Sequence, residues 1–154
     1  FITKTVETLK QKRAIVTEGI AQLKCASLVA PQATIYAWVD FSKLKGKFVP
    51  TSAIPTAAAQ ESADVMNDRQ RNAGGFSIAV PADVMRYLVF VAGICPVQGT
   101  PFFAPGSPAA DEDWHVRMSI CNDEAELKRG MAKLLKAESL LKDSAAQAAT
   151  RKEA

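Results

Sequence analysis

Apolar residues recur every three or four positions near both ends of the chain, a spacing typical of helices that bury one face. Over residues 3–23 the recurring apolar positions are Val6, Leu9, Val16, Ile20 and Leu23. Polar residues lie between them, and Arg13 occupies a gap in the apolar stripe. The pattern predicts an amphipathic helix over residues 3–23 that packs on a sheet by its apolar side.

The second helical pattern follows Cys121. Asn122 can cap a helix, and the carboxylates of Asp123 and Glu124 favour the positive end of its dipole. The apolar positions that follow are Leu127, Met131, Leu134, Leu135 and Leu141. We therefore expect a helix here, followed over residues 144–154 by a polar, alanine-rich tail that is frayed or disordered.

A third helix is predicted over residues 81–92. Pro81 suits the first turn of a helix, and Gly93 suits the left-handed conformation that often ends one. The residues between them are apolar almost all round. This helix should therefore be buried on more than one side.

Strands are predicted where β-branched and aromatic residues gather between turn formers. Residues 26–30 and 35–41 form one such pair, separated by a turn that begins with proline, so a hairpin is expected. Alternation places Tyr36 and Trp38 on the same face of the second strand. These aromatic side chains are expected in the core or at a domain interface.

Residues 94–97 and 114–120 are the other two predicted strands, joined by a connection rich in Gly, Pro and Asp. In the second of them, alternation puts Val116, Met118 and Ile120 on one face and His115, Arg117 and Ser119 on the other. His115 is expected to be structural or partly exposed. The pattern leaves two interpretations of Arg117 open: a solvated side chain, or a rigidly held fork for a carboxylate or phosphate.

Residues 49–80 carry little periodicity and are rich in Ala, Ser, Thr, Pro, Gln and Gly. We interpret them as a loop insertion with one helical turn over residues 63–69. The elements together predict an α+β fold in two layers, with a short mixed sheet of about four strands and helices mainly on one face.

Length and charge limit the class of protein. A chain of 154 residues, 48% apolar and 23% charged, has room for one domain with a sizeable core. The net charge of +3 is too small to favour nucleic acid or an anionic membrane as a partner. The longest apolar stretch, residues 87–95, is too short to span a bilayer.

The three cysteines, Cys25, Cys95 and Cys121, are widely spaced, and the chain has one histidine. This distribution offers no plausible zinc set, so no metal site is expected. We interpret the cysteines as buried, reduced thiols, which favours a reducing compartment such as the cytoplasm.

Several motifs occur in an order that resembles the C-terminal small domain of fold-type I pyridoxal-phosphate aminotransferases. The motif V-x-G-x-x-F is met by Val97, Gly99 and Phe102, and the motif R-x-S by Arg117 and Ser119. Together with the helices, these motifs cover most of the first 141 positions.

Two further segments extend the resemblance. The segment P-Q-A-T-I-Y is similar to the family's P-x-G-x-x-Y strand, with Ala33 where glycine is usual. The runs G-I-C-x-V-x-G and W-H-x-R look most like the alanine aminotransferase branch, although Gln98 replaces the branch's usual proline.

The resemblance implies a function for a domain spanning residues 1–143. It would be the small domain of an enzyme that transfers an amino group between an L-amino acid and a 2-oxo acid on pyridoxal 5'-phosphate. Arg117 would hold the substrate carboxylate. Phe102 would line the pocket beside it, with core packing as its alternative role. The intact enzyme would be a homodimer.

The lysine that carries the cofactor would come from a large domain of the same parent chain. The chain opens on Phe1, so we expect a piece of a longer protein that is inactive alone and contains no catalytic residue. Ser42-Lys43 superficially resembles the cofactor-lysine segment, but Asp40 and Thr51 depart from that motif. We interpret the lysines of this segment as solvated turn residues: Lys43, Lys45 and Lys47.

Two other classes of protein stay open. One is a free-standing, non-catalytic α+β module that binds a small carboxylate or a protein. The other is the small domain of a related fold-type I lyase or synthase.

Overall fold

A computed structural model describes residues 2–55, 74–104 and 106–143. In this part of the chain a four-stranded sheet has the strand order β1-β2-β6-β5, and a second sheet has the order β4-β3-β7. The first sheet comprises β1 (Ser27–Leu28), β2 (Tyr36–Asp40), β5 (Val97–Gln98) and β6 (His115–Ser119). The α+β class is confirmed. Neighbouring strands pair antiparallel in both sheets, where the sequence had suggested a mixed sheet.

The pairing of β2 with β6 forms the centre of the first sheet. Trp38 lies opposite Arg117, and Asp40 lies opposite His115. The inward face of these two strands is buried through Ala37, Val39, Val116 and Met118. The outward face carries Tyr36 and Trp38, which remain 36% and 38% exposed. The two faces predicted by alternation are therefore confirmed.

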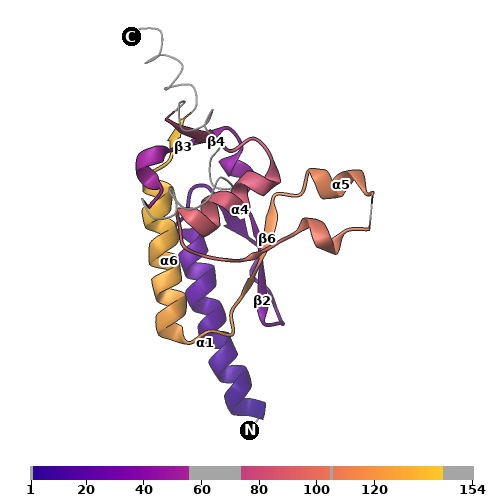
Figure 1. Cartoon of the computed structure of the whole chain (residues 1–154). Helices are drawn as coiled ribbons and strands as arrows, with labels where there is room; N and C mark the ends of the chain where they lie inside the picture. Colours follow the sequence, from indigo (N-terminus) through magenta and orange to yellow (C-terminus); the bar gives the residue numbers. More distant parts are fainter. Residues whose placement is uncertain (1, 56–73, 105, 144–154) are drawn as a thin grey trace.

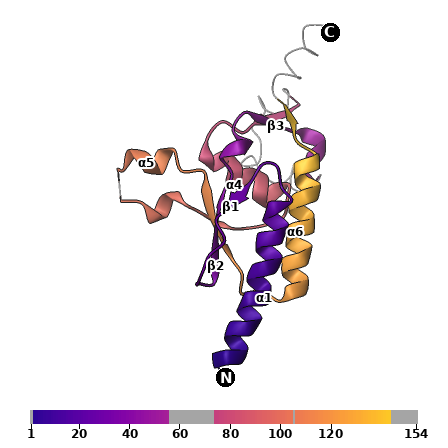
Figure 2. The ribbon, with the colours of Figure 1, turned by 180° about the vertical axis from the view of Figure 1, so that it is seen from behind.

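Helices cover the buried face of this sheet. They are α1 (Ile2–Ala21), α4 (Pro81–Phe90) and α6 (Glu124–Ser139), with the short α5 (Pro108–Asp111) set apart. Both views show α1 and α6 side by side, with the first turns of α1 extending past the start of α6 (Figure 1, Figure 2). Side chains of α1, α4, α6 and the sheet join one apolar cluster, so the core lies between the helices and the sheet.

Capping groups set the ends of two helices. The Asp123 carboxylate accepts a 2.7 Å hydrogen bond from the amide of Glu126, so Asp123, and not Asn122, caps α6. Helix α4 begins at Pro81, and Gly93 follows its last turn with φ +64°, as predicted. The left-handed region favours glycine because a Cβ would crowd the backbone there.

The second sheet corrects the interpretation of residues 49–80 as a loop. Strand β3 (Lys47–Pro50) pairs with β4 (Gly75–Ser77) on one side and with β7 (Lys142–Asp143) on the other. Both described ends of the segment are therefore built into the fold. The helical turn predicted at 63–69 lies outside the described residues, as does the predicted tail at 144–154.

The interpretation of the lysines and cysteines needs correction at three positions. Lys43 and Lys45 are exposed as expected, but Lys47 lies on β3, 2.5 Å from the carboxylate of Asp143. Cys25 is buried, whereas Cys95 and Cys121 are exposed, because they lie in irregular segments outside the core layers. In the described part of the chain, no helix is long and apolar enough to cross a membrane.

Candidate functional site

Arg117 stands on the outward face of β6 between two aromatic rings. Its guanidinium carbon lies 4.3 Å from the centre of the Tyr36 ring and 4.9 Å from the centre of the Phe102 ring. Tyr36 comes from β2, beside β6, while Phe102 comes from a short 3-10 helix, η3 (Thr100–Phe102). A guanidinium held against ring faces loses fewer rotamers when it binds a ligand than a free one does.

The donors of this guanidinium are available for a ligand. Within the described residues Arg117 forms no hydrogen bond and no ion pair with an acidic side chain. An arginine guanidinium has five N–H donors in a fixed fork and no acceptor. The planar fork therefore suits a bidentate contact to a carboxylate or phosphate.

Phe102 is positioned by the turn that precedes it. Its amide donates a 2.9 Å hydrogen bond to the carbonyl of Gly99, and the Thr100 hydroxyl donates one of 3.2 Å to the carbonyl of Ala110 in α5. The ring meets Trp38 edge-on, with 5.4 Å between centroids and 77° between planes. With 50% of its surface exposed, Phe102 is not a core residue. Its ring lies against Arg117, but it is not among the residues that line the cavity bordering that arginine.

A cavity of about 320 Å³ borders Arg117. Its apolar lining includes Val16, Leu127 and Met131 from the two long helices. Its polar lining includes Arg117, Ser119, Asn122, Glu126, Arg129 and Lys133. The lining thus includes three cations and one carboxylate, Glu126, which is paired with Arg129 and leaves Arg117 and Lys133 as the cations beyond that pair. This lining favours an anionic ligand.

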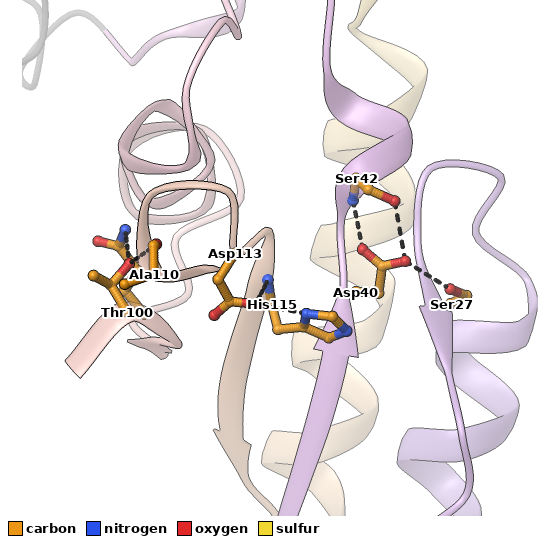
Figure 3. Close-up of polar contacts among 8 residues, drawn as sticks. Ser27, Asp40, Ser42, Thr100, Ala110, Asp113 and His115 are labelled. Atoms are coloured by element: carbon orange, nitrogen blue, oxygen red, sulfur yellow. Dashed lines mark hydrogen bonds and ion pairs between the residues drawn. The ribbon is translucent and has the colours of Figure 1, made fainter. Parts of the chain in front are cut away.

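Beside this site lies a pair that the sequence did not predict. His115 Nδ1 is 2.7 Å from Oδ1 of Asp113, and the same oxygen accepts a 3.2 Å hydrogen bond from the amide of His115 (Figure 3). The Asp113 side chain is 4% exposed, and that of His115 is 40% exposed. In a neutral imidazole, this contact assigns the proton to Nδ1 and leaves Nε2 free.

The His115 ring also stacks on Trp38, with centroids 5.9 Å apart and 19° between planes. Asp40, directly across the sheet from His115, accepts hydrogen bonds from Ser42 and Ser27 instead (Figure 3). The aspartates of the 111–113 segment resemble ordinary loop residues in the sequence. The spacing D-x-H before R-x-S was the only signal that could have suggested the pair.

Other candidate groups lie elsewhere. Lys43 is exposed on the 3-10 helix η1 (Ser42–Leu44) and is not among the residues that line the cavity. Among the residues that the structure describes, no group of three or more His, Cys, Asp or Glu side chains could hold a metal ion.

Solved aminotransferases share this fold. An aspartate aminotransferase from Rhizobium meliloti matches with a TM-score of 0.66 and 22% identity, over 92% of this chain and 28% of the enzyme. A candidate kynurenine aminotransferase from Saccharomyces cerevisiae matches with a TM-score of 0.60 and 21% identity, over 90% of this chain and 28% of that one. An alanine aminotransferase from Pyrococcus furiosus matches with a TM-score of 0.58 and 12% identity, over 89% of this chain and 25% of that one.

The chain thus spans about a quarter of the length of the solved enzymes it matches, a share that suits one domain of a larger enzyme. No protein-family model and no curated protein sequence matches it. At these identities the similarity establishes the fold. The chain has the fold of one domain of fold-type I pyridoxal-phosphate aminotransferases, as its motifs had suggested.

Proposed function

We propose that this chain is the small domain of a pyridoxal-phosphate aminotransferase, and that Arg117 binds the α-carboxylate of the substrate. The observation that carries the proposal is the Arg117 guanidinium, which lies between Tyr36 and Phe102, beside a cavity, with no acidic partner in the described part of the chain. Two parallel N–H···O bonds from that fork would fix both the position and the plane of a carboxylate.

This chain contributes orientation to the reaction. A bound carboxylate on Arg117 restricts the rotation of the substrate, and holding reacting groups in alignment can contribute several kcal/mol to catalysis. The same arginine would serve the amino donor and the 2-oxo acid, since both present an α-carboxylate. Phe102 and Tyr36 would hold the guanidinium from its two sides while it binds the carboxylate.

The cofactor belongs to another part of the proposed enzyme. The donor set around Arg117 fits a substrate carboxylate, and the proposal assigns the lysine and the other groups that hold pyridoxal 5'-phosphate to the large domain. When bound, that cofactor supplies the electron sink for transamination. This chain alone is therefore expected to be inactive.

Exposed apolar residues support a missing neighbour. Ile2 and Val6, in the first turns of α1, are 76% and 45% exposed, although they belong to the apolar side of an amphipathic helix. A large domain packed on this end of α1 would bury them. A homodimer in the cytoplasm remains the expected state of the intact enzyme.

The amino donor is proposed on motif similarity. The runs around Cys95 and His115 resemble the alanine aminotransferase branch, whereas the solved relatives include enzymes described for aspartate, kynurenine and alanine. L-alanine with 2-oxoglutarate is therefore the first pair to test, followed by aspartate and aromatic donors.

The test uses the full-length protein with pyridoxal phosphate. We expect its cofactor absorbance band to shift when L-alanine is added and to return with 2-oxoglutarate. Arg117→Ala should lower kcat/KM for both substrates by about 100-fold. Arg117→Lys, which keeps the charge without the fork, should have a kcat/KM between those of the wild type and Arg117→Ala. Arg86→Ala is the matched control, because Arg86 lies on α4 and contacts Asp83.

Each alternative class predicts a different result. A protein that neither binds the cofactor nor responds to amino acids would contradict the enzyme and favour a binding module. An absorbance change that accompanies elimination or condensation products, without a new amino acid, would favour a lyase or synthase. Equal activity of wild type and Arg117→Ala would overturn the role of Arg117.

A further inference from the structure

Asp113 is one of two buried acidic residues in the described part of the chain. Its carboxylate is 4% exposed, and its Oδ2 atom has no hydrogen-bond partner among the described residues. A buried acceptor without a partner costs free energy, so such a group calls for a physical explanation. Sites that break a local rule of this kind are often functional.

Through one of its oxygen atoms, Asp113 is connected to Arg117 by a series of contacts between aromatic rings. Oδ1 holds His115, whose ring stacks on Trp38, and Trp38 in turn meets the edge of Phe102. Phe102 then covers the Arg117 guanidinium at 4.9 Å. The contacts form a continuous series from Asp113 to Arg117 along the outward side of the sheet.

A second contact leads to the same aromatic ring through the backbone. Oδ2 of Asp113 lies against Gly99, where a Cβ atom would overlap the carboxylate. Gly99 donates a 2.9 Å hydrogen bond to the carbonyl of His115 and accepts one from the amide of Phe102. The carboxylate therefore supports the start of the turn that carries Phe102.

These two routes converge on one side chain. Phe102 is half exposed, so its own packing does not hold it firmly. We infer that Asp113 is a positioning residue: it fixes Phe102 from the His115–Trp38 side and from the Gly99 turn, and thereby sets the plane of the Arg117 guanidinium. The inference rests on the proposed function, in which that plane receives the substrate carboxylate.

The plane of the fork matters because a bidentate contact tolerates little rotation. A misplacement of about 1 Å in a binding group can lower catalytic efficiency by about 100-fold. Loss of Asp113 should therefore weaken the binding of every substrate that uses Arg117, and by the same factor.

The experiment measures both substrates in the full-length enzyme. Asp113→Ala should raise KM for the amino acid and KM for the 2-oxo acid by one common factor, between about 10 and 100, with a smaller change in kcat. Asp113→Asn keeps an acceptor oxygen near His115 and should recover most of the loss. Asp111→Ala is the control, because Asp111 is an exposed acid at the end of α5, two residues away.

A double-mutant cycle separates positioning from general damage. In the Arg117→Ala background, Asp113→Ala should raise neither KM further, because the contact it supports is already absent. If the KM increases of the two single variants multiply in the double variant, the inference is overturned. A soluble Asp113→Ala enzyme with unchanged KM values would also overturn it. If Asp113→Ala does not fold, His115→Ala removes the ring between Asp113 and Trp38, and unchanged KM values would overturn the inference equally.

Failure of the proposed function has its own signature. In that case the wild-type protein shows no transamination, or Arg117→Ala leaves both KM values unchanged. An active wild type that depends on Arg117 and ignores Asp113 contradicts only the positioning role.

Discussion

The backbone amide of Cys25 donates a 2.6 Å hydrogen bond to Oε1 of Glu138, which lies 113 residues further along the chain. The bond joins the turn after α1 to the last turn of α6, at the edge of the core. Burial raises the pKa of the Cys25 thiol far above its ordinary value of 9.0, and the Glu138 carboxylate raises it further.

Thiol labelling should therefore distinguish the three cysteines. Cys95 and Cys121 are exposed and should react with a thiol reagent in the folded protein, whereas Cys25 should react only on unfolding, because the thiolate is the nucleophile. Mass spectrometry of the labelled peptides gives the answer. Labelling of Cys25 at the rate of the other two would contradict its burial.

Alkaline pH should destabilise this domain. Burial raises the pKa of Tyr87 well above its ordinary 10.0, as it does for Cys25, so the unfolded chain loses these protons first. The stability from the two neutral groups is complete below about pH 9 and is lost as pH rises, by up to about 1.4 kcal/mol per pH unit for each group.

Tyr87→Phe tests the tyrosine part of this effect. The Tyr87 hydroxyl is buried without a hydrogen-bond partner among the described residues, so its removal should cost little near neutral pH. The free energy of unfolding, followed from pH 7 to 11, should fall less steeply above pH 10 than in wild type. Identical slopes would show that Tyr87 ionises freely in the folded state.

Removal of the helix cap should weaken α6. Asp123→Ala loses the hydrogen bond to the Glu126 amide and should destabilise the helix by about 1 kcal/mol. Asn122→Ala is the matched control and should have little effect, because Asn122 is not the cap. Hydrogen exchange of the first amides of α6 measures both. Faster exchange in the Asn122 variant alone would contradict this assignment.

Gly99→Ala should damage the site and the fold together. Its Cβ would overlap the Asp113 carboxylate and crowd the carbonyl of His115, so we expect a loss of about 1 to 3 kcal/mol in stability and weaker substrate binding. Gly130→Ala in α6 is the contrasting control, since its Cβ meets open space and should stabilise the helix by about 1 kcal/mol. Thermal unfolding compares the two; an unaffected Gly99 variant would mean that Asp113 moves freely.

Thr34 holds a strained conformation before β2. Its φ of +87° is unfavourable for a residue with a branched Cβ. Thr34→Gly should relieve about 1 kcal/mol of this strain and raise the melting temperature. Thr8→Gly, in α1, should lower it, because glycine is unfavourable inside a helix. A lower melting temperature for Thr34→Gly would show that contacts of the threonine outweigh the strain.

The predictable parts of the fold were those with a local physical cause. Alternation along β6 assigned Val116 and Arg117 to opposite faces correctly, because successive side chains of a strand point to opposite sides of the sheet. Pro81 and Gly93 marked the ends of α4 correctly, because the fixed φ of proline and the tolerance of glycine for positive φ are properties of single residues.

Long-range pairing escaped prediction. Lys47 and Asp143 meet across 96 residues, on strands of four and two residues that carry no periodicity of their own. The cap at Asp123 rather than Asn122 was equally hidden, because either side chain could accept the bond and backbone geometry chose between them.

The sequence alone determined the α+β class, the three long helices, the two faces of the central strands and the resemblance that drew attention to Arg117 and Phe102. Periodicity and local backbone preference suffice for these features. Only the tertiary structure decided that Tyr36 and Phe102 enclose Arg117 and that His115 stacks on Trp38. Such contacts join residues whose distance in space depends on the packing of the whole chain, so no local pattern encodes them.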